Sequence, residues 1–335
     1  MKRRHRIGAL VGALAALIAQ PLPAKENPET MIAIAIHGGA GVIARDQLGP
    51  DNGAQYHRGL EEALDAGYAV LASGGSSLDA VSTAVRILED NPLFNAGRGA
   101  VLNHEGIAEL DASIMNGKNL AAGAVAGLRR VRHPIDLARR VMENSPHVML
   151  YGAGAEEFAA GQGLEFVPNE FFITPTRRQQ LDRVLRGATQ PKNELQGLGT
   201  VGAVAVDAAG NVAAATSTGG MTNKRWGRIG DAPIIGAGTY ANNASCAVSA
   251  TGHGEYFIRS VVAHDICALV EYKKLSLREA AREVVQRKLV ERGGEGGIIA
   301  VSPRGEVVME FNSPGMFRGM RDSGGRRLTA IYEEK

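Results

Sequence analysis

The stretch Gly199-Thr200-Val201-Gly202-Ala203-Val204-Ala205-Val206 decides how the rest of this 335-residue chain is interpreted. It places a threonine at the start of an apolar run, directly after an irregular polar segment, residues 187–199. A threonine hydroxyl is a weak nucleophile without a base beside it, and the threonine's own α-amine, which titrates at about pH 7.7–8.0, can be that base. Because an internal threonine has no free amine, this hypothesis requires scission between Gly199 and Thr200. The alternative is a Gly-Thr pair that enters an ordinary strand.

The residues that follow predict a β-hairpin. Thr200–Asp207 has the composition of a buried strand, Ala208-Ala-Gly-Asn211 is a turn, and Val212–Ser217 is the return strand. The return strand runs into Thr218-Gly219-Gly220. Because the two strands of a hairpin are antiparallel, a second threonine is expected at the level of the first.

Hairpins and helix pairs alternate along the rest of the chain. Strands come first, then helices, twice over, which predicts an α+β fold of packed layers and not a doubly wound parallel sheet. No linker-like boundary divides the chain into two folded halves. The further predicted elements are a strand Met31–Ile36 that ends in a Gly38–Gly41 turn, helices Ala54–Ala72 and Leu78–Glu89, a hairpin of Ile107–Met115 and Ala121–Leu128, helices Pro134–Met142, Ala153–Ala160, Arg177–Arg186, Glu255–Glu271 and Leu277–Glu291, and a closing hairpin of Ile298–Ser302 and Glu306–Phe311.

The first 24 residues have the composition of an export signal. Four basic residues precede an apolar run, Ile7–Ala19, and Leu22-Pro-Ala24 offers a small-residue cleavage site. The alternative is an N-terminal membrane anchor. Without these residues 33 basic and 35 acidic residues remain, so the formal net charge changes from +2 to −2. The basic balance therefore belongs to the leader and indicates no nucleic-acid partner.

Two cysteines, Cys246 and Cys267, could pair in an oxidising compartment such as the bacterial periplasm, or remain buried free thiols. The sequence leaves both possibilities open. The eight histidines and two cysteines show no spacing typical of a metal site.

Several ordered motifs resemble one family. Thr200–Val206, Thr216–Asn223, Gly227–Gly238 and Ala250–Gly254 are similar to the plant-type L-asparaginase/isoaspartyl peptidases, which are N-terminal-nucleophile hydrolases. Upstream stretches resemble the same family, so the likeness runs from about Met31 to the C-terminus. These stretches are Ile36-His-Gly-Gly-Ala-Gly41, Asn91-Pro-Leu-Phe-Asn-Ala-Gly97 and Glu109-Leu-Asp-Ala112. The resemblance implies a four-layer αββα sandwich cut into an α subunit, 25–199, and a β subunit, 200–335, with residues 187–199 as a mobile linker.

The resemblance also implies roles for the hydroxyl groups. Thr200 is the expected nucleophile and, through its freed amine, the base. Thr218 is expected to place that nucleophile by hydrogen bonding, and Thr251 with the Gly252 amide to form the oxyanion hole. As isolated residues, Thr218 and Thr251 would be interpreted as strand-end hydroxyls that satisfy the backbone.

A charged loop is the expected substrate cradle. Arg228 offers a planar fork for a carboxylate, and Asp231 accepts hydrogen bonds from an ammonium, so the two suit both ends of an α-amino acid. The alternative is that they pair with each other on the surface. Backbone groups of Gly220 and Gly254 are expected as additional contacts.

The loop before these motifs carries two further expectations from the resemblance. Asn95 is expected close to the nucleophile, although an Asn-Ala-Gly sequence is also ordinary turn chemistry. Main-chain carbonyls are expected to bind a structural sodium ion, and the residues concerned are Leu88, Glu89, Asn91, Phe94, Ala96 and Arg98. No organic cofactor is implied.

Two other motifs suggest different chemistry. His37 stands beside glycines as in the oxyanion motif of esterases, but no Gly-x-Ser-x-Gly accompanies it, so a packing or turn-bracing role is expected. Arg321-Asp-Ser-Gly-Gly325 resembles the serine neighbourhood of chymotrypsin-like proteases, yet nothing else of that pattern is present, and a C-terminal turn is expected.

The sequence thus predicts an exported, self-cleaving amidohydrolase of L-asparagine or β-aspartyl dipeptides that assembles as a dimer of αβ units. Glycosylasparaginases are a sibling alternative, but their nucleophile typically follows His-Asp, whereas Leu198-Gly199 stands here. Threonine aspartases usually carry longer insertions. An uncut amino-acid-binding relative with the same cradle is the alternative outside enzymes.

Overall fold

A computed structural model describes residues 31–41, 48, 50–187 and 199–333 of the chain. The predicted leader, 1–24, and residues 188–198 of the predicted linker lie outside the described residues. The elements of the first half are β1 (Ala33–Gly41), α2 (Pro50–Ala72), α3 (Ser77–Asp90), β2 (Leu110–Asn116), β3 (Ala122–Leu128), α4 (Pro134–Asn144), β4 (Met149–Tyr151), α5 (Gly152–Gly161), η1 (Asn169–Phe172) and α6 (Pro175–Leu185). Those of the second half are β5 (Val201–Val206), β6 (Val212–Thr218), β7 (Thr239–Ala241), β8 (Ala247–Gly252), α7 (Gly254–Ser260), α8 (Val262–Lys273), α9 (Leu277–Arg282), η2 (Glu283–Leu289), β9 (Gly296–Val301), β10 (Val307–Phe311), β11 (Gly315–Asp322) and β12 (Arg327–Ala330).

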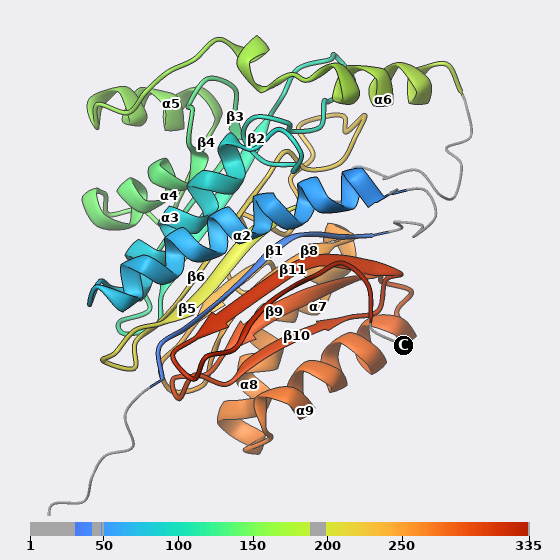
Figure 1. Ribbon diagram of the computed structural model, residues 1–335. Coiled ribbons are helices and arrows are strands. Elements are labelled where there is room, and N and C mark those ends of the chain that lie inside the picture. The colour runs from blue at the N-terminus through green and yellow to red at the C-terminus, as the bar shows by residue number, and fades with distance from the viewer. Residues whose placement is uncertain (1–30, 42–47, 49, 188–198, 334–335) are drawn as a thin grey trace, which may run out of the picture.

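The strands form two sheets that pack face to face. The larger sheet has the order β12-β11-β1-β5-β6-β2-β3-β4, and the smaller has the order β10-β9-β8-β7. Helices α2, α3 and α4 pack on the outer face of the larger sheet, and α8 and α9 pack on the outer face of the smaller one (Figure 1). The predicted α+β class, with two sheets, is confirmed.

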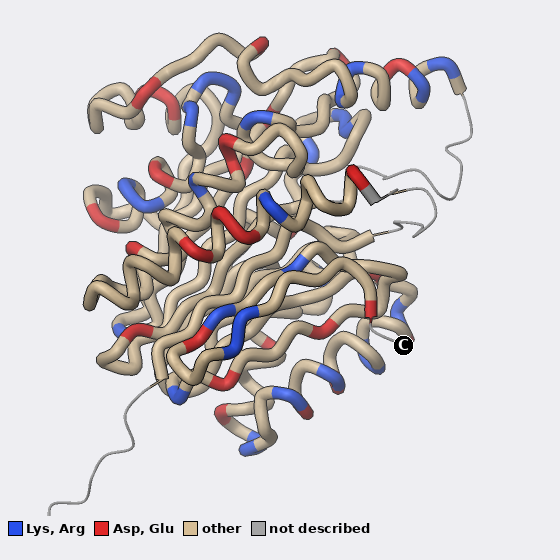
Figure 2. The backbone as a smooth tube through the Cα atoms, in the orientation of Figure 1, with Lys and Arg blue, Asp and Glu red and all other residues tan. Residues whose placement is uncertain are grey.

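The burial of strand β5 follows from this packing. The larger sheet is covered by helices on one face and by the smaller sheet on the other, so all six residues of β5 are buried. Strands covered on both faces are continuously apolar instead of alternating, as the run from Val201 to Val206 is. Charged residues lie mainly on the outer helices and on the β11–β12 hairpin (Figure 2). The nucleophile candidate thus stands at the end of a strand in the centre of the molecule.

The predicted hairpin after Thr200 is confirmed. Strands β5 and β6 are antiparallel, with Val201 opposite Ser217 and Val206 opposite Val212. The hairpin of β2 and β3 and the closing hairpin of β9 and β10 are also confirmed. The long helix predicted from Leu277 is present as α9 followed by the wider turns of η2.

Two predictions about elements were wrong. Strand β1 does not end before the glycines but continues to Gly41, with a bulge between His37 and Gly39. The single helix expected over Glu255–Glu271 is broken into α7 and α8 at Val261, which has φ +49°. The C-terminal turn predicted for Arg321–Gly325 is confirmed at Ser323 and Gly324, and it joins two strands that were not predicted, β11 and β12.

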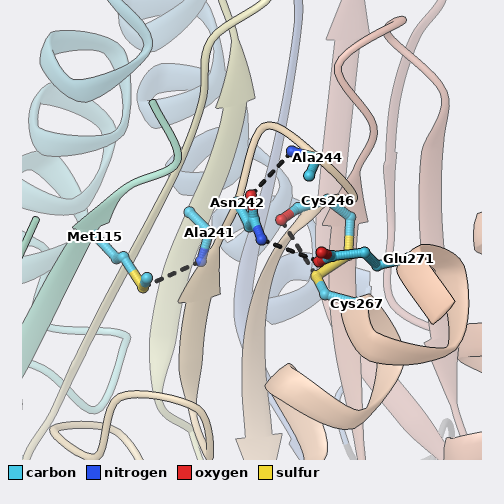
Figure 3. Close-up of a disulfide and its surroundings, with 7 residues drawn as sticks. All are labelled: Met115, Ala241, Asn242, Ala244, Cys246, Cys267 and Glu271. Atoms are coloured by element: carbon cyan, nitrogen blue, oxygen red, sulfur yellow. Dashed lines mark hydrogen bonds between the residues drawn. A yellow bond between two sulfur atoms is a disulfide. The ribbon is translucent and has the colours of Figure 1, made fainter. Parts of the chain in front are cut away.

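The two cysteines form a disulfide. Cys246, just before β8, is bonded to Cys267 on α8, with their Cα atoms 5.4 Å apart (Figure 3). Both residues are buried between the smaller sheet and its helices. The bridge therefore ties the start of β8 to the helix layer, and β8 carries Thr251 and Gly252 at its other end.

Candidate active site

Strands β5 and β6 bring the two predicted threonines together. Thr200 is the residue before β5, Thr218 is the last residue of β6, and the Oγ1 atoms of the two are 3.0 Å apart. The Thr218 hydroxyl oxygen also accepts the Gly220 N–H at 3.0 Å. Both side chains are buried. The hydroxyl of Thr218 thus accepts from the predicted nucleophile and is itself fixed by the turn that follows β6.

The bond before Thr200 lies against strand β1. A Cβ atom at Gly39, where φ is +113°, would stand 2.3 Å from Gly199 Cα, which no side chain tolerates. A Cβ at Gly199 would lie 3.2 Å from Asn95 Cβ. Gly39 is therefore a glycine because the backbone carrying the proposed scission site passes directly over it.

Asn95 connects the loop after α3 to the turn after β6. Its Nδ2 donates to the Gly220 carbonyl at 2.8 Å, and its Oδ1 accepts the Val101 N–H at 2.8 Å. The side chain is buried. Asn95 thus lies next to Gly199 and braces Gly220, as a residue close to the nucleophile should.

The predicted oxyanion residues stand at the end of β8. The Thr251 hydroxyl oxygen accepts the Ala40 N–H of β1 at 3.2 Å. A hydroxyl that accepts a hydrogen bond still has its own hydrogen to donate. Thr251 and Gly252 are therefore held at the end of β1 that also touches Gly199, with one hydroxyl donor available.

Arg228, Asp231 and Gly254 form the charged cradle, and the surface ion pair between Arg228 and Asp231 is absent. Arg228 does not pair with Asp231; its Nε and Nη2 donate to the Glu255 carboxylate at 2.9 and 3.1 Å. A Cβ at Gly254 would lie within 3.0 Å of both Arg228 and Asp231, so these three residues are in direct contact range of one another. The side chain of Arg228 is 20% exposed, so its fork is within reach of a ligand.

Asp231 is the most unusual group of this cradle. It is 4% exposed, and its Oδ2 has no hydrogen-bond partner. Burial, which removes water from the carboxylate, raises the pKa of Asp231 to about 7, against the attraction of Arg228. A buried carboxylate with a free oxygen suits a cationic ligand group such as an ammonium.

Two buried charges that sequence reasoning assigned no role lie near this cradle. Asp111 of β2 stands directly opposite Thr218, its Oδ2 has no hydrogen-bond partner, and burial raises its pKa against the attraction of Lys224 and Arg228. Lys224, which is 5% exposed, donates to the Glu109 carbonyl at 2.9 Å and lies beneath Gly220. The motif Glu109-Leu-Asp-Ala112 was the available signal for Asp111, whereas nothing marked Lys224 or Glu255.

The loop expected to bind sodium is wound tightly by glycines. Gly97 and Gly99 have φ of +50° and +101°, and a Cβ on Gly99 would lie 2.5 Å from the Pro92 carbonyl oxygen and 2.7 Å from that of Phe94. The Glu89 carbonyl accepts the Arg98 N–H at 2.7 Å and the Asn91 carbonyl that of Phe94 at 3.2 Å, which leaves each a second lone pair. Oxygen ligands of this kind fit a hard cation.

An exposed aromatic residue stands close to Arg228 in the sequence. Trp226, two residues before Arg228, is 95% exposed and is the only tryptophan of the chain. Within the part of the chain that the structure describes, no group of three or more His, Cys, Asp or Glu side chains could hold a metal ion.

Comparison with known proteins places these features in one family. A family profile described as asparaginase matches residues 30–331. The isoaspartyl peptidase of Salmonella typhimurium is 53% identical over 308 residues, which cover 90% of this chain and 98% of that protein. The isoaspartyl peptidase of Escherichia coli is 52% identical, with 90% and 96% covered. A probable isoaspartyl peptidase/L-asparaginase 2 of Arabidopsis thaliana is 44% identical, with 90% and 99% covered.

Proposed function

The chain belongs to the asparaginase family, and from that membership we propose that it is an isoaspartyl peptidase with L-asparaginase activity. Its substrates are β-aspartyl dipeptides and L-asparagine, and the common product is L-aspartate. The relatives that carry these names match nearly the whole chain, so the activity is assigned to the whole fold and not to a fragment of it.

The observation that carries this function is the hydrogen bond of 3.0 Å between Thr200 Oγ1 and Thr218 Oγ1, at the end of a buried hairpin. A hydroxyl nucleophile gains reactivity from a neighbouring group that orients it and from a base that takes its proton. Thr218 supplies the first. Scission of the Gly199–Thr200 bond supplies the second as a new α-amine, and this scission makes the chain an N-terminal-nucleophile hydrolase with subunits 25–199 and 200–335.

The reaction then proceeds in two displacements. Thr200 Oγ1 attacks the β-carbonyl carbon, and its proton passes to the α-amine. The oxyanion accepts hydrogen bonds from the Thr251 hydroxyl and the Gly252 amide. The carbon–nitrogen bond breaks as the leaving amine takes the proton from the α-amine. Water next attacks the aspartyl ester, the α-amine takes the proton of that water, and L-aspartate leaves as Thr200 regains its hydroxyl hydrogen.

The charged cradle holds the other end of the aspartyl group. The α-ammonium binds the free oxygen of Asp231, and the α-carboxylate binds the guanidinium of Arg228. Because Glu255 occupies that guanidinium in the free protein, the substrate carboxylate must share or replace its hydrogen bonds. Backbone groups of Gly220 and Gly254 complete the contacts.

A sodium ion in the loop after α3 is part of the proposal. Main-chain carbonyls of the predicted set would hold it, together with the carbonyl of Pro92, which lies with that of Phe94 beside Gly99. It would supply no reacting atom and would fix the loop that carries Asn95. An ion that binds only the folded state raises the melting temperature. The melting temperature should therefore rise with sodium chloride more than with choline chloride at equal ionic strength.

The chain's setting is proposed from its leader and its disulfide. A cleaved export signal would deliver it to the bacterial periplasm, where a bond between Cys246 and Cys267 persists. The αβ unit is proposed to form a dimer. N-terminal sequencing of the protein secreted by a bacterial host, and its mass in solution, test these two points.

The decisive experiment compares the natural chain with Thr200→Ala. The natural chain should give two bands on a denaturing gel, with the smaller fragment beginning Thr-Val-Gly-Ala, and should hydrolyse β-aspartyl-leucine. Thr200→Ala should give one band and no hydrolysis. Thr329→Ala, on the edge strand β12, is the matched control and should behave as the natural chain does. Two bands from Thr200→Ala would refute self-cleavage, and an N-glycosylated asparagine preferred over β-aspartyl-leucine would favour a glycosylasparaginase.

A further inference from the structure

The feature that the function leaves unexplained is His37, buried between the two sheets. Its Nδ1 is 2.9 Å from the Thr200 carbonyl oxygen, and its Nε2 is 2.9 Å from Ser249 Oγ. A carbonyl oxygen can only accept, so Nδ1 must carry a hydrogen. Burial lowers the pKa of His37 to about 3, so the ring is neutral and its Nε2 bears no hydrogen. Ser249 must therefore donate to Nε2, and the tautomer follows from the contacts.

A chain of buried hydroxyls continues from Ser249. The Ser249 hydroxyl lies 2.7 Å from Thr216 Oγ1, and Thr239 donates to Thr216 at 2.5 Å. Because the hydrogen of Ser249 is committed to His37, Thr216 is the donor to Ser249. Ser113 lies 2.7 Å from Thr239 Oγ1 and 2.6 Å from the Ala232 carbonyl oxygen. Ser113 has one hydrogen, which either of these two oxygens can accept. Donation thus runs in one direction from Thr239 through Thr216 and Ser249 to His37 and the carbonyl of the nucleophile.

A glycine of the deciding stretch keeps this contact open. A Cβ at Gly202 would stand 2.0 Å from Ser249 Oγ and 2.4 Å from His37 Nε2. No side chain could occupy that position while the bond between His37 and Ser249 remained. The small residue two places after the nucleophile therefore has a physical reason, which is room for the imidazole and its hydroxyl partner.

The nucleophile needs such an anchor because it stands outside the sheet ladder. Pairing between β5 and β6 begins at Val201, and pairing between β5 and β1 begins at Gly202. Once the preceding bond is cut, Thr200 becomes a chain end, and chain ends are poorly ordered unless they are tied down. A displacement of about 1 Å at a reacting group can cost about 100-fold in rate.

We propose that His37 is a positioning residue for the nucleophile: its Nδ1–H holds the Thr200 carbonyl, and the hydroxyl chain of Ser249, Thr216, Thr239 and Ser113 fixes the ring in the tautomer that can do so. This inference rests on the proposed function. It concerns the placement of Thr200 and not the binding of substrate, so it affects kcat and leaves KM unchanged.

Two conservative variants separate this role from simple core packing. In His37→Asn the amide nitrogen occupies the place of Nδ1 and can still donate to Thr200. In His37→Gln the amide lies one methylene further out, nearer Ser249. Both variants bury one amide, so packing alone predicts that His37→Gln, with the larger side chain, is the better of the two. His57→Asn is the matched control, because the Nδ1 of His57 bonds Thr329 Oγ1 of β12, the strand at the edge of the larger sheet.

The measurements are the cut fraction on a gel and kcat and KM of the cut enzyme with β-aspartyl-leucine. His37→Asn should keep kcat within about tenfold of the natural enzyme, and His37→Gln should lose about 100-fold with KM within about twofold. His57→Asn should match the natural enzyme. Equal kcat values for the two His37 variants, or a better His37→Gln, would overturn the proposal, as would a loss confined to KM.

A second test does not depend on substitution at His37. The imidazole nitrogen-15 shifts of the natural enzyme should show the neutral Nδ1–H tautomer from pH 5 to pH 9, and an Nε2–H tautomer would overturn the proposal. If neither His37 variant melts cooperatively, Ser249→Ala decides, since it removes one hydroxyl only. It should lower kcat about tenfold without changing KM, and an unchanged kcat counts against the proposal. A natural enzyme inactive on β-aspartyl-leucine would refute the proposed function instead, whatever the tautomer.

Discussion

At the scale of single residues, the cradle buries the carboxylate of Asp231, and burial disfavours its charged form in the protein without substrate. Asp231 has one unpartnered oxygen and a pKa of about 7, against an ordinary value of 3.8. Between those two pH values the folded chain binds a proton that the unfolded chain has released. The free energy of unfolding therefore falls as the pH rises from about 4 to about 7. The folded chain thus loses stability at the pH where the proposed function requires an anion at Asp231 for the substrate ammonium.

The substitution Asp231→Asn should separate these two effects. It removes the buried charge, so the melting temperature of the free protein at pH 8 should rise, by a free energy on the order of a few kcal/mol at most, with little change at pH 4. It also removes the partner that we propose for the substrate ammonium, so kcat/KM should fall by about 10- to 150-fold. Thermal melts at the two pH values and steady-state kinetics at pH 8 measure both.

Asp51→Asn is the control, because Asp51 is exposed on the first turn of α2. It should change neither quantity. A melting temperature of Asp231→Asn below that of the natural protein at pH 8 would show that Asp231 already has a stabilising partner.

At the scale of elements, the sequence predicted those whose local signals agree with their surroundings. The β5–β6 hairpin joins two apolar runs through a turn with Gly210, and the structure has it as predicted. Strand β11 was missed because it carries arginines, whose charges look incompatible with a strand. The structure explains them: Arg321 reaches Asp65 of α2 at 2.8 Å, and Arg318 donates to main-chain carbonyls. Long side chains that find distant partners leave no local pattern.

The break between α7 and α8 was missed for a related reason. The apolar period continues across it, and Val261 is the residue that takes φ +49°. A β-branched residue rarely adopts that conformation, which costs about 1–2 kcal/mol. Nothing in the sequence marks a valine as a break.

The substitution Val261→Gly should therefore stabilise the protein. Relief of the left-handed strain exceeds the added entropy of glycine, so we expect a net gain of about 0.5–1 kcal/mol, and a melting temperature higher by about 1–4 °C. Val262→Gly is the control: it is buried at the start of α8 without the unusual φ, and it should lower the melting temperature. Differential scanning calorimetry measures both, and a lower value for Val261→Gly would contradict the strain argument.

At the scale of the whole molecule, the disulfide joins the smaller sheet to its helices. Cys246 and Cys267 are 21 residues apart in the chain. In the chain-entropy account, a loop of this size stabilises the folded state by about 3 kcal/mol. The double variant Cys246→Ala/Cys267→Ala should thus melt several degrees lower. It should keep its KM for β-aspartyl-leucine, because the bridge lies at the opposite end of β8 from Thr251.

Reduction supplies the control for that variant. The natural protein in a reducing buffer should approach the melting temperature of the double variant, and the double variant should not respond to the reductant. Peptide mass spectrometry without reduction should recover the two cysteines in one linked fragment. A free thiol on either cysteine of the oxidised protein would contradict the bridge.

Across the molecule, the sequence predicted the residues of the site better than the buried residues that hold them in place. The threonines, Arg228 and Asp231 stand in motifs with recognisable chemistry, and the structure brings the two threonines together and gathers Arg228 and Asp231 with Gly254. Lys224 and Ser249 stand in no such motif. Their importance comes from burial beside residues far away in the chain, and a sequence does not display such proximity. The cysteine pair, left open by the sequence, was decided by the packing of α8 on β8.

The exposure of Trp226 has an optical consequence. Its indole, 95% exposed, already sits in water, so unfolding should leave the emission maximum nearly where it was. Because it is the sole tryptophan and stands two residues from Arg228, filling of the cradle by L-aspartate should alter its intensity. Titration with L-aspartate at a fixed wavelength would then yield a dissociation constant without any label, while urea alone would give almost no spectral shift.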